Sequence, residues 1–433
     1  MIAPDARDGT FIVRGGRPLT GRVVPAGNKN EALPTLAASL LAPGATRIEN
    51  LPRIDDMFAM VRILESVGVQ AKWQDDHSVS LDASDVTTDT PDPAVCKRIR
   101  GSLLMVPGLL HRRGRALLPQ PGGDRIGRRR VDTHLLALRA LGAEAEARLG
   151  EYELKLNGRF RGADVWLDEA SVMATENAVM AASVADGRSV IINAACEPHV
   201  QGLCRMLVAM GAQITGIGTN RLEIEGVREL HPANHRIGPD HIEIGSFAAL
   251  AAMTGGEVVI ADVVPEDLGM IRLVFERLGV KLALEGRALR VPANQSMVIE
   301  DDMDGAIPTV ADAPWPGFPA DLTSIALALA TQAHGTALIH EKMFESRLFF
   351  VDRLIAMGAR IVLCDPHRAI VSGPARLHGQ QLASPDIRAG MALIAAALTA
   401  EGQSVIMNIH QVDRGYENID GRLRALGASI ERV

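Results

Sequence analysis

The sequence predicts an α/β protein built from six βαβ-type repeats, arranged as two lobes of three repeats each. Two observations in the 433 residues predict this fold class. An apolar helix that ends in glycine and continues into an alternating strand recurs six times. Between these stretches, an alanine-rich helix, a turn containing glycine and a β-branched strand also recur. A repeat of roughly 70 residues is too small to bury its own helix face, so the repeats must pack against one another.

The first recurring stretch predicts six helix ends. Their glycines are Gly68, Gly142, Gly211, Gly279, Gly358 and Gly427. The intervals between these positions are 74, 69, 68, 79 and 69 residues, by subtraction. Glycine is favoured after the last turn of a helix because it adopts the left-handed conformation without steric cost. The residues that follow alternate in polarity, as in 212–215 and 359–363, and this alternation predicts strands.

The second recurring stretch predicts the remaining helices and strands. It is clearest in residues 180–193, 251–262, 325–341 and 391–408. Six repeats are more than one core usually holds, whereas three plus three give lobes of about 200 residues, near the usual upper size of a domain. We place the junction near residues 231–238. An open solenoid is the alternative, but its repeats usually have about 20 to 50 residues.

Composition and charge exclude several classes of protein. The chain has 45 Lys and Arg residues against 52 Asp and Glu residues, a net charge of −7, which argues against a nucleic-acid-binding protein. No apolar run reaches the ~18 residues of a membrane helix, and residues 1–9 do not resemble a secretory signal. Four scattered cysteines and the spacing of the histidines predict neither disulfides nor a metal site. We therefore expect a soluble, cytoplasmic protein without a metal; its oligomeric state is left open.

The first candidate site is Gly27-Asn-Lys29-Asn30, which precedes an alanine-rich helix. Free backbone N–H groups at a helix N-terminus, together with a lysine, favour an anion site. Only six of the 45 basic residues are lysines, so a lysine at this position suggests that a compact charge is needed. The alternative is a plain N-cap by an asparagine, with Lys29 in solvent.

The second candidate site is the glycine-rich stretch 121–134, in which Asp124 lies among four arginines. The glycines allow the backbone to approach a ligand, and the guanidinium groups suit phosphate or carboxylate. A solvated surface loop has the same composition and is the alternative.

The third candidate is Asp321, which follows a turn rich in proline and aromatic residues and precedes an apolar helix. A carboxylate held by such a turn could accept a hydroxyl proton, although aspartate is also a common N-cap. Scattered arginines complete the set, and singly each is more often a surface or salt-bridged residue than a ligand contact. They are Arg100, Arg347, Arg388 and Arg414.

Residues 27–30 and 121–127, together with 11–16, 413–416 and 426–433, resemble the enolpyruvyl transferases, and the resemblance extends over nearly the whole chain. It implies a two-lobed inside-out α/β barrel. It also implies that residues 1–28 join residues 238–433 in a C-terminal lobe. Residues 29–237 would then form an N-terminal lobe that carries the glycine-rich catalytic loop 121–130.

The resemblance further implies a reaction without a cofactor. The enolpyruvyl group of phosphoenolpyruvate would be transferred to the 3-hydroxyl of UDP-N-acetylglucosamine by addition and elimination of phosphate, the first committed step of peptidoglycan synthesis. Asp124 would donate a proton, Asp321 would accept the hydroxyl proton, and Lys29 and Arg414 would hold phosphoenolpyruvate. The substrate-binding residues implied are Asn30, Arg100, Arg129, Arg130, Val131, Asp132, Thr133, Glu169, Ser171, Val172, Met343, Arg347, Asp386 and Arg388.

This sequence departs from the common family pattern at a few positions. Asp124 stands where most members have cysteine, which predicts insensitivity to the epoxide antibiotic fosfomycin. Arg130, Glu169, Met173 and His241 replace the Pro, Lys, Gly and Arg of the commonest members. Most of these changes concern the nucleotide, so two alternatives stay open: a paralogue that acts on another nucleotide or nucleoside in secondary metabolism, and a catalytically silent anion-binding relative. Shikimate 3-phosphate is a weaker candidate because the loop 121–127 does not match that enzyme's pattern.

Overall fold

A computed structural model describes residues 9–124 and 126–433 and divides the chain into two compact units. The N-terminal lobe consists of Gly27–Gly123 and Arg130–Gly238. The C-terminal lobe consists of Pro239–Val433, the chain up to Ala26 and the segment Asp124–Arg129. The sequence places the whole loop 121–130 in the N-terminal lobe, whereas the structure groups its central part with the C-terminal lobe. The physical reason is that this part bonds to residues of the C-terminal lobe, as described below.

The C-terminal lobe has three four-stranded sheets in the residues that the structure describes. In each of them one edge strand runs parallel to its neighbour and the other pairs are antiparallel. The strands, in sheet order, are β2 (Thr20–Val23), β14 (Glu257–Ala261), β16 (Ala288–Val291) and β15 (Ala283–Glu285); β17 (Thr309–Ala311), β18 (Gly335–His340), β20 (Arg368–Gly373) and β19 (Arg360–Asp365); and β21 (Gln381–Ala383), β22 (Gln403–Met407), β1 (Thr10–Arg14) and β23 (Ser429–Arg432).

The N-terminal lobe repeats this plan, with two four-stranded sheets and one three-stranded sheet in its described residues. The strands, in sheet order, are β13 (Asn234–Arg236), β3 (Ala45–Glu49), β5 (Ser78–Asp82) and β4 (Gln70–Asp75); β9 (Asp164–Trp166), β10 (Arg188–Ile192), β12 (Arg221–Glu225) and β11 (Gln213–Thr215); and β6 (Arg115–Pro119), β8 (Glu151–Lys155) and β7 (Glu144–Arg148).

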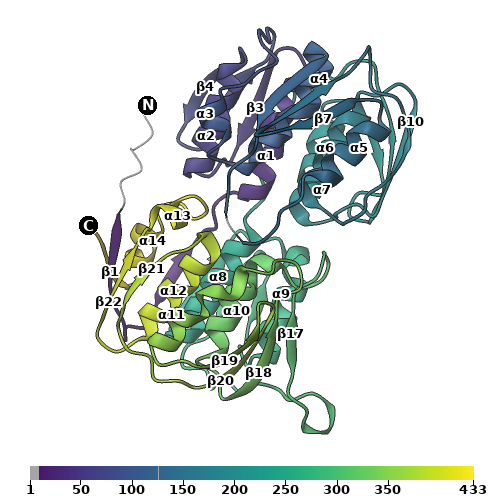
Figure 1. Cartoon of the computed structure of the whole chain (residues 1–433). Coiled ribbons are helices and arrows are strands. Elements are labelled where there is room, and N and C mark those ends of the chain that lie inside the picture. Colours follow the sequence, from purple (N-terminus) through teal and green to yellow (C-terminus); the bar gives the residue numbers. More distant parts are fainter. Residues whose placement is uncertain (1–8, 125) are drawn as a thin grey trace. The chain divides into compact units, whose positions relative to one another are not determined.

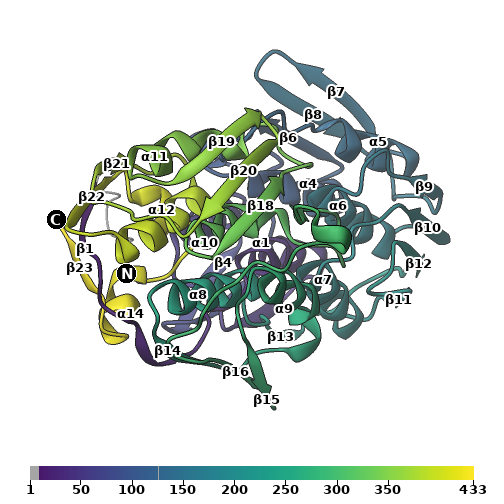
Figure 2. The same cartoon turned by 90° about the horizontal axis from the view of Figure 1, so that it is seen from below.

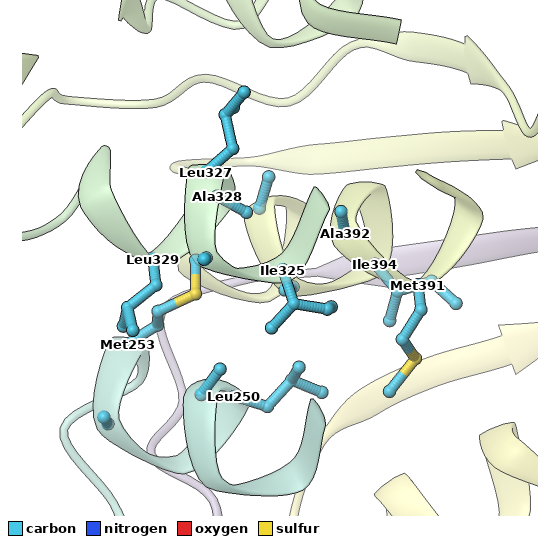
Figure 3. Packing of buried hydrophobic residues seen from close by; sticks show 14 of the residues in the cluster. Leu250, Met253, Ile325, Leu327, Ala328, Leu329, Met391, Ala392 and Ile394 are labelled. Atoms are coloured by element: carbon cyan, nitrogen blue, oxygen red, sulfur yellow. The ribbon is translucent and has the colours of Figure 1, made fainter. Parts of the chain in front are cut away.

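Three apolar helices form the centre of the C-terminal lobe: α8 (His241–Met253), α10 (Thr323–Ala330) and α12 (Ile387–Thr399). Every residue of α8 and α10 is buried, and only the last residue of α12 is not. Helices that are apolar on all sides must be enclosed, and these three pack on one another through side chains such as Leu250, Ile325 and Ile394 (Figure 3). The strands β18 and β20 cover α10 from outside (Figure 2). The sheets are therefore outermost, which is the inside-out arrangement.

The remaining helices are distributed over both lobes (Figure 1). In the C-terminal lobe they are α9 (Gly269–Arg277), α11 (Val351–Ala356), α13 (His410–Asp413) and α14 (Ile419–Ala425). In the N-terminal lobe the mainly buried helices are α1 (Lys29–Ala38), α4 (Met105–Arg113) and α6 (Val172–Ser183), and the others are α2 (Asp55–Ser66), α3 (Pro93–Cys96), α5 (Asp132–Ala140) and α7 (Pro198–Ala209). Each lobe encloses its own hydrophobic core.

The structure confirms the predicted α/β class with three repeats in each lobe. Each repeat contains an inner helix, a central strand, an outer helix and a hairpin, as in α10–β18–α11–β19–β20. The six predicted helix-ending glycines all have positive φ, between 84° and 107°. The sixth repeat is completed by the N-terminal strand β1, which pairs with β22 on one side and β23 on the other. Among the described residues, no helix is both long and apolar enough to cross a membrane.

Candidate functional site

Asp321 lies in the turn Ala320–Leu322 just before α10, and its carboxylate binds two arginines. Oδ1 accepts a hydrogen bond from Arg347 Nη2 at 2.9 Å. Oδ2 accepts from Arg388 Nε at 3.1 Å and lies 3.0 Å from Arg388 Nη2. The side chain of Asp321 is 29% exposed, whereas those of the arginines are 2% and 6% exposed. The N-cap positions of this turn and of α10 are occupied by Pro319 and Leu322, so the N-cap interpretation is wrong for Asp321.

The two arginines are fixed by their own elements. Arg388 is in the first turn of α12, where Asp386 is the N-cap and accepts from the N–H groups of Arg388 and Ala389 at 2.8 and 2.9 Å. Burial alone would lower the pKa of Arg388, but Asp321 and Tyr416 reverse the sign and that pKa lies above its usual range. Burial likewise opposes the charge of Arg347, and Asp321 followed by other acids keeps its pKa raised. Both side chains are therefore cations at every physiological pH.

Asp124 forms an ion pair with Arg414, and these side chains are 16% and 15% exposed. Arg414 Nη1 also donates to Gln411 Oε1 at 2.9 Å. Arg129 belongs to the same group of charges: burial lowers its pKa, Asp124 and Asp321 raise it, and neighbouring arginines lower it. The structure thus brings together four predicted arginines with Asp124, Asp321 and Asp386. Asp386 already accepts the N–H groups at the start of α12. The four arginines therefore outnumber the two other carboxylates, which favours the binding of an anionic ligand.

The loop that bears Asp124 is bonded to the segment that bears Arg347. The N–H of Arg128 donates to Glu345 Oε1 at 2.8 Å, and the N–H of Ser346 donates to the carbonyl of Ile126 at 3.2 Å. Gly127 has a φ of 125°, and a Cβ built there would lie 2.6 Å from Glu345 Oε2. Glycine is required at this position because both the backbone conformation and the close carboxylate exclude a side chain. This part of the loop is therefore bonded to the protein rather than merely solvated.

His241 and Met343 also lie in the C-terminal lobe. His241 begins α8, is buried, and its ring lies 5.8 Å from that of Trp315. Burial lowers the pKa of His241, with Asp240, Arg388 and Asp321 among the charges near it. This departure from the family pattern thus lies beside the Asp321 cluster, and the buried imidazole is neutral. Met343 is 37% exposed.

In the N-terminal lobe, Lys29 begins α1 and is buried. Its Nζ lies 2.7 Å from Asp56 Oδ2, and the two side chains are 9% and 6% exposed. Asn28 is the N-cap and accepts from the N–H groups of Asn30 and Glu31 at 2.8 and 3.2 Å. The N-cap interpretation is therefore correct for Asn28, but Lys29 is not solvated. An anion at this helix would have to share Lys29 with Asp56.

A second polar group of the N-terminal lobe centres on Arg130. Arg100 Nη2 donates to the carbonyl of Arg130 at 2.7 Å, and Arg130 forms ion pairs with Asp132 at 3.2 Å and Asp168 at 2.7 Å. Thr133 Oγ1 donates to Asp168 Oδ1 at 2.6 Å. Sequence reasoning missed Asp168, although it directly precedes Glu169. Glu169 is exposed, and Val131, Ser171 and Val172 lie at the starts of α5 and α6.

The predicted site residues thus divide between the lobes. The C-terminal lobe contains Asp124, Arg129, Asp321, Met343, Arg347, Asp386, Arg388 and Arg414, and the N-terminal lobe contains the others. Sequence reasoning also missed two fully buried acids, Asp312 and Glu341, the second of which lies 3.5 Å from Arg347. Among residues 9–124 and 126–433, no group of three or more His, Cys, Asp and Glu side chains has the arrangement of a metal site.

The chain is similar to a known protein family and to named bacterial proteins. The family model of EPSP synthase (3-phosphoshikimate 1-carboxyvinyltransferase) matches residues 13–423. The chain is 51% identical over 421 residues to a protein of Treponema denticola and 54% identical over 423 residues to one of Bradyrhizobium diazoefficiens. These alignments cover 97% and 98% of this chain and 98% of each relative. Both relatives are named UDP-N-acetylglucosamine 1-carboxyvinyltransferase.

A solved structure is also similar. The enolpyruvyl transferase NikO from Streptomyces tendae superimposes with a TM-score of 0.87 at 25% identity, covering 99% of each chain. The fold is therefore that of the enolpyruvyl transferases, and the sequence is considerably closer to the two bacterial relatives than to NikO.

Proposed function

The chain belongs to the EPSP synthase family of enolpyruvyl transferases, and from this premise we propose that it transfers the enolpyruvyl group of phosphoenolpyruvate to the 3-hydroxyl of UDP-N-acetylglucosamine. Phosphate is released, and the reaction is the first committed step of peptidoglycan synthesis. The observation that supports this most directly is the Asp321 carboxylate held between Arg347 and Arg388, in the same lobe as the Asp124–Arg414 pair. That lobe offers a base, an acid and cations for an anionic substrate.

The reaction balances with these residues in two steps. In the addition, Asp124 gives a proton to the methylene carbon of phosphoenolpyruvate, the sugar oxygen bonds to C2, and Asp321 accepts the hydroxyl proton. In the elimination, the new methyl group returns a proton to the Asp124 carboxylate, the bond from C2 to the phosphate oxygen breaks, the proton held by Asp321 passes to the leaving phosphate, and the C=C bond re-forms. A proton donor of this kind contributes about 10²–10⁴-fold to the rate.

The arginines support the binding of phosphoenolpyruvate. Arg129, Arg388 and Arg414 present guanidinium groups that suit carboxylate and phosphate, and Lys29 remains a further predicted contact. An anion bound to Arg414 competes with Asp124 for that cation. Binding of the substrate would therefore loosen the ion pair between Arg414 and the proposed proton donor.

The acceptor is assigned by the relatives and by the polar residues of the N-terminal lobe. Relatives that are 51% and 54% identical have the UDP-N-acetylglucosamine enzyme name, while NikO is only 25% identical. We assign the nucleotide to the groups around Arg130 and to the start of α6, and the sugar to Met343. Because phosphoenolpyruvate and nucleotide sugars are metabolites of the cytoplasm, we place the protein there.

A phosphate-release assay with several acceptors tests the proposed function. Purified protein is given phosphoenolpyruvate with UDP-N-acetylglucosamine, UMP or shikimate 3-phosphate. We expect release with the UDP-sugar alone. Release only with another acceptor would identify a paralogue of different specificity, and no release with any acceptor would identify a silent relative.

A further inference from the structure

Two buried carboxyl groups, those of Asp312 and Glu341, lie side by side, and Glu341 is close to Arg347 of the Asp321 cluster. Strands β17 and β18 run parallel with Ala311 opposite His340, so the next residues, Asp312 and Glu341, are neighbours at the carboxyl ends of these strands. Both side chains are fully buried. Two adjacent carboxyl groups cannot both ionise cheaply in a buried site, because like charges repel and neither is solvated.

The contacts of this pair show what it holds. Asp312 accepts hydrogen bonds from the N–H groups of Lys342 and, at 3.2 Å, of Met343. Glu341 Oε1 accepts from the N–H of Phe344 at 3.1 Å. The pair therefore binds three successive backbone N–H groups of the segment 342–347, which leads to Arg347.

The pair also touches Arg347 itself. Glu341 Oε2 lies 3.5 Å from Arg347 Nε, while Arg347 Nη2 donates to Asp321 at 2.9 Å. The Arg347 guanidinium also lies 5.1 Å above the ring of Phe344, whose N–H is bonded to Glu341. One cation thus lies between a fully buried carboxyl and the proposed base.

Other titratable groups near the pair are few. Lys342 and His340 are on the same segment, and His367 Nδ1 contacts the carbonyl oxygen of Glu341 at 2.7 Å. Burial raises the pKa of Glu341 to about 8, Arg347 opposes this, and Asp312 adds to it.

We propose that Asp312 and Glu341 form a positioning pair that shares one proton at neutral pH and thereby leaves the charge of Arg347 to Asp321. Glu341 bears the proton, and Asp312 accepts two backbone N–H groups of the segment. When the pair loses this proton, Glu341 becomes a second anion that competes with Asp321 for Arg347 and repels Asp312. The segment 342–347 and the orientation of the base are then disturbed.

The pH profile of turnover tests this pair, and this test rests on the proposed function. Wild-type kcat is expected to fall about tenfold per pH unit above about pH 8. Glu341→Gln keeps a neutral donor beside Asp312 and an acceptor for Phe344, so it should keep kcat within about threefold at pH 7 and lose the alkaline fall. Because Asp312 raises the pKa of Glu341, the alkaline fall of Asp312→Asn should begin at lower pH.

Glu401→Gln is the matched control, because Glu401 is an exposed partner of Arg376 far from these strands in the sequence. It should reproduce the wild-type profile. If Glu341→Gln retains the wild-type alkaline fall, or if Asp312→Asn leaves its position unchanged, the proposal is overturned. A purely structural role would lower kcat at every pH without moving the profile.

Unfolding measured against pH gives a readout that needs no catalysis. A carboxyl with a raised pKa in the folded state binds a proton that the unfolded chain has already lost above about pH 4.3. Its stabilisation is therefore present below that pH and is lost as the pH rises through about 8. Between pH 5 and 9 the urea midpoint of the wild type should therefore fall relative to that of Glu341→Gln. If the urea midpoints of the wild type and Glu341→Gln change with pH in parallel, the proposed pair is refuted, even if the enzyme is active. If their difference grows with pH but the protein shows no transferase activity, only the proposed function is refuted.

Discussion

Exchange of Asp321 for asparagine separates the two roles that the structure allows for this residue. Asp321 is the proposed base, and it also neutralises Arg347 and Arg388. Asparagine has nearly the same shape, but it is neutral and presents N–H groups to one of the two guanidinium groups. Both kcat and the free energy of unfolding should therefore fall, each for its own physical reason.

The stability effect follows from three contacts at 2.9, 3.1 and 3.0 Å. A hydrogen bond to a charged group contributes about 1.5–3 kcal/mol, and removing one partner of a buried ion pair costs about 3–5 kcal/mol. Asparagine keeps one acceptor oxygen, and the aspartate side chain is 29% exposed, so solvent screens part of the interaction. We expect the free energy of unfolding to fall by about 2 kcal/mol.

The catalytic effect should be larger. A positioned general base contributes about 10²–10⁴-fold, so kcat for phosphate release should fall by at least about 100-fold. The assay measures phosphate at saturating phosphoenolpyruvate and UDP-N-acetylglucosamine, and urea unfolding of the same samples gives the stability.

Asp420→Asn is the matched control for loss of a carboxylate that binds two arginines. Asp420 contacts Arg432 at 2.8 Å and Arg424 at 3.0 Å, is 7% exposed, and has no proposed part in the reaction. Its exchange should lower stability by a similar amount and leave kcat within about twofold. If Asp321→Asn loses stability but keeps more than about a tenth of kcat, the role of base is refuted and Asp321 only neutralises the arginines.

Four further predictions concern the loop and the core. Asp124→Ala should lower turnover at least about 100-fold without altering the fold, and near-normal activity would remove Asp124 from the mechanism. Fosfomycin should give neither time-dependent inactivation nor a mass adduct with the wild type, whereas Asp124→Cys should gain both; an adduct on the wild type would contradict this. Gly127→Ala should lower kcat and also lower the free energy of unfolding by about 1–3 kcal/mol, because alanine is strained at a φ of 125° and its methyl group would displace Glu345; an unchanged kcat would show that this contact is dispensable. Leu327→Ala, in the buried α10, should lower the free energy of unfolding by about 2–5 kcal/mol, whereas Leu273→Ala, 51% exposed on α9, should change it by less than about 0.5 kcal/mol; equal losses would contradict the inside-out core.

Local features of the fold could be predicted because local chemistry determines them. The six glycines at helix ends have the expected positive φ, since a left-handed residue after a helix is a requirement of that turn alone. The partners of the edge strands could not be predicted. The pairing of β1 with β22 joins residues such as Phe11 and Ile406, and nothing in either stretch specifies the other. Short strands such as Thr309–Ala311 also lack the length that shows alternation.

The candidate site was predicted as a set of residue types, but not as a set of contacts. A carboxylate before a helix suits both an N-cap and a base, and only the bonds from Arg347 and Arg388 distinguish the two for Asp321. The motif around Lys29 contained no sign of its partner Asp56, which lies 27 residues further on.

Asp312 and Glu341 show the same limit. Each is an acid directly after a strand, and an acid at that position is only a weak signal of a buried carboxyl. Only the parallel register of β17 and β18 shows that they are neighbours.

Analysis of the product formed from phosphoenolpyruvate and UDP-N-acetylglucosamine is the decisive test of the proposed enolpyruvyl transfer. We expect one phosphate to be released for each UDP-N-acetylglucosamine consumed. We also expect a product whose mass is increased by one enolpyruvyl group, with the enol ether on the 3-oxygen of the sugar. Phosphate release without that product, or an enolpyruvyl group found only on another acceptor, would contradict it.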